Sequence, residues 1–212
     1  MTITRRDIIQ QIVVLLGGTA LAGGDRVLGF SFEEETLAQT MTQGVGAFTV
    51  ADIALLDEIA ETILPETSTP GAKAAKTGAF MALMVTDVYT LPLQQVFGEG
   101  LRSVDDECRR AHGTPFMQVT PAQRLSVVEA LDREQQRVMD ARRAEPTNRA
   151  PAPESTSTEP AHYFRLMKEL VLLGYFTSEI GCTKALRYIE SPGRFDPCAP
   201  HAPGDRAWAG HA

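Results

Sequence analysis

The residues that could ligate a metal are few and scattered along the chain. Cysteines stand at positions 108, 182 and 198, and none of them forms the C-x-x-C pair that is typical of zinc or iron–sulfur sites. The nearest approach to a ligand set is Cys198 with His201 and His211 in the tail. Zinc requires four organised ligands, and tail histidines are usually solvated. The sequence therefore predicts that the chain itself binds no metal or cofactor.

Covalent and nucleotide chemistry also lack a recognisable motif. The sequence contains no glycine-rich dinucleotide or phosphate loop, no nucleophile elbow and no zinc-protease helix motif. Cys108 lies on an apolar helical stripe, where burial raises the pKa of a thiol and makes it inert. Acidic pairs such as Asp105 with Asp106 are adjacent in sequence and do not converge from separate elements. We predict a chain without catalytic residues.

The first 22 residues carry the features of an export signal. Arg5 and Arg6 precede an apolar stretch, 8–22, that is too short to span a bilayer comfortably and that glycines keep only moderately hydrophobic. The order of residues 4–9 resembles the twin-arginine signal, and cleavage after Ala22 would follow an A-x-A triplet. The alternative is an ordinary amphipathic helix with two chance arginines. Because the twin-arginine route moves folded proteins, this signal predicts export together with a bound partner.

Length, charge and cysteine number narrow the class of protein further. A chain of 212 residues with 43% hydrophobic residues is long enough for one domain with a sizeable core. The 20 basic and 27 acidic residues give a net charge of -7 without a basic stripe, so we expect no nucleic-acid partner. The odd number of cysteines means that, in an oxidising compartment, at least one stays free or pairs with another chain.

Hydrophobic periodicity predicts an all-α fold, a single compact domain of about five or six helices. Thr49 with Asp52 forms a capping box, and Pro65 ends the helix that follows. A pair at 91–92, Leu-Pro, is expected to end the second helix, and Gly113 the third. Five of the expected helices are 53–64, 79–90, 94–112, 162–175 and 178–188. A further helix is expected to begin at 121, after the cap Thr120, and its charged part, 132–143, is expected to project into solvent. In the helix 162–175, the apolar face holds Tyr163, Leu166, Met167, Leu170 and Leu173.

The composition divides the chain into segments around this domain. Residues 1–22 form the signal segment and 23–48 a polar lead-in. The helical domain covers 49–190 and contains a flexible linker at 145–160, because a stretch rich in Pro, Ser and Thr cannot bury enough apolar surface to order itself. Residues 191–212 are expected to be an irregular tail with several prolines.

Two stretches of the sequence resemble a known family. The first is LLDEIAETILPETSTPGAKAA at 55–75, and the second is FRLMKELVLLGYFTSEIGCTKALRY at 164–188, which PGRFDPC follows at 192–198. Both are similar to blocks of the gluconate 2-dehydrogenase subunit 3 family. The Pro-rich insertion at 145–160 departs from that family pattern, and its role is unassigned.

This resemblance implies a small, non-catalytic subunit of a membrane-associated sugar, polyol or aldonate dehydrogenase at the periplasmic face of the inner membrane. In such complexes a large subunit of the glucose-methanol-choline oxidoreductase type binds FAD, and a multihaem cytochrome c subunit passes electrons to quinone. The small subunit carries the export signal that the twin-arginine translocase reads. FAD and haem c therefore belong to the partners, and this chain would stabilise the flavin subunit and carry it out of the cytoplasm.

The residues that we expect to matter follow from this hypothesis. Arg5 and Arg6 direct export. The expected contact with the partner consists of the helices 53–64, 79–90 and 162–188 together with the tail. Within it we single out Phe195, Pro197 and Cys198, since an extended segment with aromatic anchors can wrap a surface. One of the three cysteines, Cys108, Cys182 or Cys198, would form an intersubunit disulfide, with an intramolecular pair or a free thiol as alternatives. The competing functional hypotheses are a stand-alone periplasmic enzyme or cofactor-binding protein, and an export chaperone that dissociates.

Overall fold

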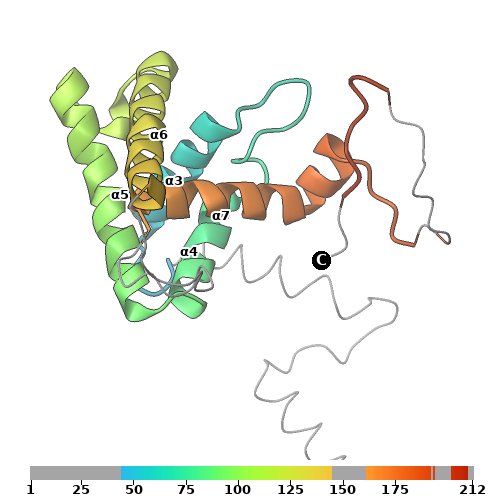
Figure 1. The fold of residues 1–212 in the computed structure, drawn as a ribbon, viewed down its shortest axis with the longest axis horizontal. Coiled ribbons are helices and arrows are strands. Elements are labelled where there is room, and N and C mark those ends of the chain that lie inside the picture. The colour runs from blue at the N-terminus through green and yellow to red at the C-terminus, as the bar shows by residue number, and fades with distance from the viewer. Residues whose placement is uncertain (1–43, 145–160, 192, 194–201, 210–212) are drawn as a thin grey trace, which may run out of the picture. The chain divides into compact units, whose positions relative to one another are not determined.

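The computed structural model describes residues 44–144, 161–191, 193 and 202–209, all of which belong to one compact unit that starts at residue 35. Within these ranges lie five α-helices: α3 (Val50–Ile63), α4 (Thr77–Asp87), α5 (Leu91–His112), α6 (Pro121–Ala144) and α7 (Tyr163–Thr177). A 3₁₀ turn, η1 (Phe116–Gln118), and a π-helical turn, η3 (Gly181–Ala185), complete them (Figure 1). The described residues contain isolated β-bridges but no strand, which confirms the predicted all-α fold.

The start of α3 confirms the predicted capping box. The Asp52 carboxylate accepts from the Thr49 backbone N–H at 2.8 Å, and the Thr49 hydroxyl oxygen accepts from the Asp52 N–H at 3.2 Å. Two of the N–H groups that a helix start leaves without partners are thus satisfied. The helix ends at Ile63, two residues before Pro65, as the proline predicts.

The boundary between α4 and α5 corrects the expectation for the second helix. We expected that helix to run to residue 90 and to end at the Leu-Pro pair 91–92. In the structure α4 ends at Asp87, and Pro92 lies in the first turn of α5. Proline lacks the N–H that a first turn would leave unpaired, so it is suited to begin a helix as well as to stop one. Gly113 ends α5 in the left-handed conformation, with φ of 79°, as predicted.

Helix α6 begins where the sequence predicts, because Gln123 and Thr120 cap each other reciprocally. Most of its charged segment 132–143 is exposed, as predicted. A few side chains of this segment instead contact α7. Asp132 accepts a 2.7 Å hydrogen bond from Lys168 of α7, and Gln135 is only 8% exposed. These polar side chains lie at the α6–α7 contact, where Asp132 accepts from both Lys168 and Gln135.

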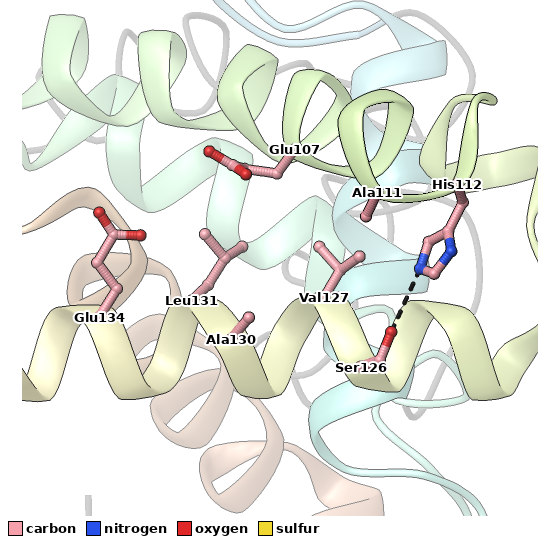
Figure 2. Close-up of a pocket in the computed structure, with 8 residues that line it drawn as sticks. All are labelled: Glu107, Ala111, His112, Ser126, Val127, Ala130, Leu131 and Glu134. Atoms are coloured by element: carbon pink, nitrogen blue, oxygen red, sulfur yellow. Dashed lines mark hydrogen bonds between the residues drawn. The ribbon is translucent and has the colours of Figure 1, made fainter.

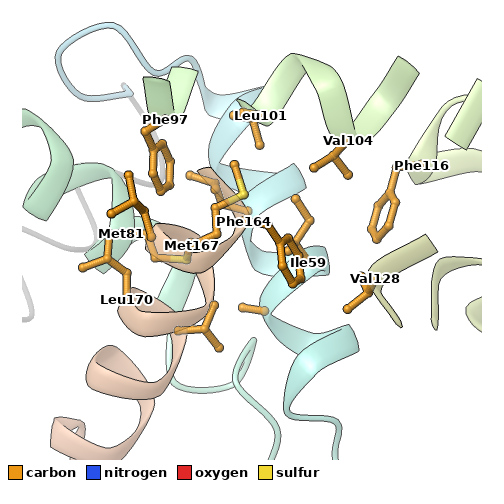
Figure 3. Close-up of a cluster of buried hydrophobic side chains, with 14 of the residues drawn as sticks. Ile59, Met81, Phe97, Leu101, Val104, Phe116, Val128, Phe164, Met167 and Leu170 are labelled. Carbon is orange, nitrogen blue, oxygen red and sulfur yellow. The ribbon is translucent and has the colours of Figure 1, made fainter. Parts of the chain in front are cut away.

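Helix α7 contacts each of the other four α-helices and therefore organises the core. The largest fully buried side chains come from α3, α4, α5, α7 and η1, and they include Ile59, Met81, Phe97, Phe116, Phe164 and Met167 (Figure 3). Burial of this apolar surface is the main favourable term for folding.

The short helix expected at 178–188 is present but ends earlier. Residues 179–180 are α-helical and continue into the π-helical turn η3, after which Leu186 is extended. Gly181 starts this turn at a position where no other residue fits, because a Cβ there would lie 1.9 Å from the Tyr175 carbonyl oxygen. The predicted signal at 1–22, the linker at 145–160 and part of the tail lie outside the described residues.

Candidate partner interface

A hollow of about 140 Å³ between α5 and α6 brings together the residues that come closest to catalytic chemistry. His112 ends α5, and its Nε2 lies 3.3 Å from the Oγ of Ser126 on α6 (Figure 2). The sequence gives no signal for this pair, because the two residues are 14 positions apart on different helices. A histidine beside a serine is the first requirement for an activated nucleophile.

The hydrogen bonds around Ser126 argue against that chemistry. Its hydroxyl donates to the Gln123 carbonyl oxygen at 2.8 Å, the shorter of its two contacts, and in this arrangement the hydroxyl proton is directed away from His112. A catalytic histidine also needs a group that orients it. Glu107, the nearest acidic candidate on α5, is held by Arg110 at 2.6 Å, and Figure 2 shows it pointing away from the His112 ring. The hollow therefore has the geometry of a helix contact.

Exposed apolar side chains are concentrated near the carboxyl end. Among the described residues, eleven large hydrophobic side chains are exposed, and six of these lie at or after residue 172. Three of them, Leu172, Leu173 and Phe176, lie on one side of α7, and we call these three the C-terminal apolar surface. The other three, Tyr188, Ile189 and Trp208, are exposed in the chain beyond α7. Clustered exposed apolar residues mark sites of association, whereas scattered ones need no explanation.

The packing of α7 explains why its outer side remains bare. Gly174 lies against the Phe80 ring of α4, where a Cβ would be 2.5 Å from a ring carbon, so one side of α7 sits close to α4. Leu170 and Val171 face the same core. We predicted that Leu173 shares this buried face, but it is 45% exposed. An amphipathic helix normally presents polar residues outward, so exposed leucines here indicate a further contact.

Residues 202–209 fold back on the chain after η3 and form what we call the C-terminal clasp. Arg187 donates its N–H to the Ala207 carbonyl oxygen and accepts from the Ala209 N–H, both at 2.8 Å. The Arg187 guanidinium lies 4.5 Å from the centroid of the Trp208 ring, a favourable cation–π distance. Arg187 Nε is buried and has no hydrogen-bond partner in the described part of the chain.

A family model identifies the class of protein. The model for gluconate 2-dehydrogenase subunit 3 matches residues 51–193, a range that runs from α3 to beyond η3. The chain belongs to the gluconate 2-dehydrogenase subunit 3 family. The family name describes a subunit of a multi-subunit dehydrogenase complex, so this chain is a subunit type and is expected to contact other chains. No curated protein and no solved structure matches it.

The predicted cysteine sites of this subunit 3 family member have different environments. Cys108 is fully buried on α5, and burial raises the pKa of its thiol, as the sequence predicted. Cys182, in η3, is half-buried, and its thiol donates to the Phe176 carbonyl oxygen at 3.2 Å. Both are free. To reach another chain Cys108 would have to leave the core, so Cys182 is the more accessible of the two. The intersubunit disulfide stays a prediction.

The remaining predicted site residues, Arg5, Arg6, Phe195, Pro197 and Cys198, lie outside the described residues. Export and the tail contact therefore stay predictions. In the described segments no helix combines the length and the apolar character that a membrane span requires. No group of three or more His, Cys, Asp or Glu side chains is placed to hold a metal in those same segments.

Proposed function

We propose that this chain is a non-catalytic accessory subunit that binds the flavin subunit of a dehydrogenase complex through the C-terminal apolar surface. The observation that carries the proposal is the row of exposed Leu172, Leu173 and Phe176 on α7, in a family whose members are named as dehydrogenase subunits. In this proposal the partner subunit binds FAD and a cytochrome c subunit accepts the electrons.

The energetics of such a contact favour a lasting complex. The three α7 side chains are already partly buried, and covering the rest of each would contribute about 1 kcal/mol. A small number of apolar anchors at the centre of an interface supplies most of the binding energy in known complexes. A subunit that binds only the folded partner also stabilises that partner, by an amount that grows with its own concentration.

Export is the second part of the proposal. Arg5 and Arg6 would direct the chain, with the folded flavin subunit bound, to the twin-arginine translocase and into the periplasm. The physical reason is that FAD is inserted in the cytoplasm and has to cross the membrane inside a folded protein. The complex would then lie at the periplasmic face of the inner membrane.

A competition experiment tests the interface. Wild-type and variant chains with different tags are co-expressed with a limiting amount of the flavin subunit, and the captured ratio of the two chains is measured. Leu173→Asp is expected to reduce capture roughly tenfold or more, because it places a charge in the apolar contact. Leu125→Asp on α6 is the matched control, since Leu125 is 47% exposed. Equal capture of both variants would contradict the proposed surface.

A fractionation experiment tests export separately. The double variant Arg5→Lys with Arg6→Lys is expected to keep the complex in the cytoplasm, with dehydrogenase activity lost from the periplasm. Equal periplasmic activity in the wild type and the variant would refute the escort role. A stoichiometric complex purified from the periplasm would distinguish a lasting subunit from a chaperone that dissociates after export.

A further inference from the structure

The connection between α3 and α4, residues 64–76, is longer than its task of joining two packed helices requires. Connections between neighbouring helices are commonly about 2–8 residues long. The two ends of this loop lie close together, because the Ala72 N–H donates to the Leu64 carbonyl oxygen at 2.9 Å. Compact surface loops with closed ends, known as Ω-loops, are frequently functional. The loop also contains the whole second half of the first family-like stretch, 55–75.

Glu61 of α3 holds this loop from inside. One carboxylate oxygen accepts from the Glu66 N–H at 2.8 Å, and the other accepts from the Lys73 N–H at 2.9 Å. Gly71 lies directly against the same carboxylate, and a Cβ at this position would be 2.3 Å from both oxygens. A single side chain thus binds both limbs of the loop, and a larger residue at position 71 would displace the carboxylate from this position.

Glu58, one turn earlier on α3, adds a second attachment. It pairs with Lys73 of the loop at 2.8 Å and also with Arg124 of α6. Burial alone would raise the pKa of Glu58, but the hydrogen bonds and charges of Lys73 and Arg124 outweigh burial and lower it. At the far end of the loop, Asp57 accepts from the Gly78 N–H at 2.7 Å in a buried position. We call Asp57, Glu58 and Glu61 the acidic clamp.

Helix α7 connects the loop to the C-terminal apolar surface. The Tyr175 hydroxyl donates to the Pro70 carbonyl oxygen at 2.7 Å, and Figure 1 shows the loop beside the second half of α7. The Tyr175 ring packs edge to face on Phe176, with centroids 5.1 Å apart. Phe176 is itself a member of the C-terminal apolar surface. The loop is therefore attached, through the buried Tyr175, to the part of α7 that carries Phe176.

The tip of the loop, residues 65–68, is exposed to solvent. It consists of Pro65, Glu66, Thr67 and Ser68. In the described part of the chain the last three form no side-chain hydrogen bond or ion pair, although the backbone of Glu66 and Thr67 is bonded. A fixed backbone thus presents one carboxylate and two hydroxyl groups to whatever lies beyond it.

We infer that this clamped loop is a preformed recognition element for the flavin subunit, an inference that rests on the proposed function. The tip would lie at the polar rim of an interface whose apolar centre is the outer face of α7. It would be met by hydrogen-bond donors of the partner, with a lysine or arginine opposite Glu66. Because the acidic clamp has already ordered the backbone, binding does not carry the entropic cost of ordering a loop.

The competition experiment with Thr67→Trp tests the position of the tip. Thr67 is outside the acidic clamp, so the bulky side chain leaves the fold intact and obstructs the partner. We expect capture by the flavin subunit to fall roughly tenfold, with an unchanged midpoint of urea unfolding. Ala141→Trp, at an exposed site on α6, is the matched control and should be captured like the wild type. Normal capture of Thr67→Trp overturns the inference. If capture of Leu173→Asp is reduced in the same experiment, the proposed function still stands. Normal capture of Leu173→Asp contradicts the proposed function itself.

Glu61→Gln tests whether the loop has to be preformed. The amide can no longer accept from both limbs of the loop, while the side chains of the tip stay the same. We expect faster hydrogen exchange at the Glu66 and Lys73 amides together with a capture ratio several-fold below that of the wild type. Faster exchange with wild-type capture would show that the clamp serves only to join α3 and α4, and would overturn the role assigned to it.

Discussion

The outer faces of the two halves of α7 differ in chemistry although the inner faces are alike. In the first half, Arg165 pairs with Glu169 at 2.7 Å and Lys168 with Asp132 at 2.7 Å. In the second half, Leu172, Leu173 and Phe176 occupy the corresponding outer positions and are exposed. Both halves bury apolar residues against the other helices. The charged half makes its ion pairs within this chain, whereas the apolar half leaves large side chains exposed, which the proposed function assigns to contact with the flavin subunit.

This difference separates residues that stabilise the fold from residues that bind a partner. A side chain that the fold has already buried contributes to the free energy of unfolding, whether or not the complex forms. A side chain on the exposed half contributes little to unfolding and much to association. Substitutions in the two halves of the same helix should therefore affect different measurements.

The largest effect is expected from Phe164→Ala in the first half of α7. Phe164 is fully buried in the core, so its truncation leaves a cavity and should reduce the free energy of unfolding by about 3–5 kcal/mol. Urea unfolding of the purified chain measures this loss. The chain that remains folded should still be captured by the flavin subunit. Selective loss of capture without loss of stability would contradict the assignment of this half to the fold.

Phe176→Ala in the second half should give the opposite result. We expect capture by the flavin subunit to fall roughly tenfold, because an aromatic anchor is removed from the interface. The free energy of unfolding should fall by no more than about 1.5 kcal/mol, the upper value of a ring contact such as that with Tyr175. Leu125→Ala is the control for an exposed apolar residue outside the surface. If Phe176→Ala unfolds as easily as Phe164→Ala, the two halves do not differ as proposed.

The C-terminal clasp should show a smaller effect that is confined to one segment. Trp208→Ala removes the cation–π contact with Arg187, which is worth about 0.5–1 kcal/mol at an exposed site. We expect faster proteolysis within 202–209 and no change in the urea midpoint of the helical core. Trp208→Phe keeps an aromatic ring and should restore part of the protection. Equal cleavage of the wild type and Trp208→Ala would show that this contact does not hold the segment.

Most of the helical fold could be predicted because its signals are local. The caps at Thr49 and Thr120 and the stop at Gly113 depend on residues within one turn of the chain, and all three were confirmed. The errors arose where the same residue suits two roles or where tertiary contacts decide. Pro92 was expected to end the second helix, but it lies in the first turn of the third. Gln135 lies in a charged segment and is nevertheless buried.

The candidate interface was much less predictable from sequence. The outward direction of Leu173 depends on which side of α7 meets α4, and an unbroken apolar run such as Leu170 to Leu173 does not reveal that side. The acidic clamp joins Glu61 to Lys73, 12 residues away, through a loop whose path no periodicity encodes. The one available signal was the excess of apolar residues on α7, more than a core-facing stripe needs.

The smallest effect is expected at the start of α7, where the charged half begins and stability should depend on pH. His162 caps the helix, because its Nδ1 accepts from the Phe164 N–H at 3.3 Å, and its Nε2 lies 4.0 Å from Glu134 of α6. Burial lowers the pKa of His162 from 6.5, because it disfavours the charged ring. The negative charge of Glu134 opposes this shift, and the positive charge of Arg142 adds to it. The unfolded chain therefore takes up a proton at a higher pH than the folded chain does. As the pH is lowered below 6.5, the free energy of unfolding decreases, and this decrease stops once the pH is below the lowered pKa of the folded state. His162→Asn keeps a cap acceptor and removes the titration, so its urea midpoint should lack this component between neutral pH and pH 5. Identical pH profiles for the wild type and His162→Asn would show that the ring does not titrate in the cap, whereas capture by the flavin subunit, which depends on the other half of α7, should be the same for both.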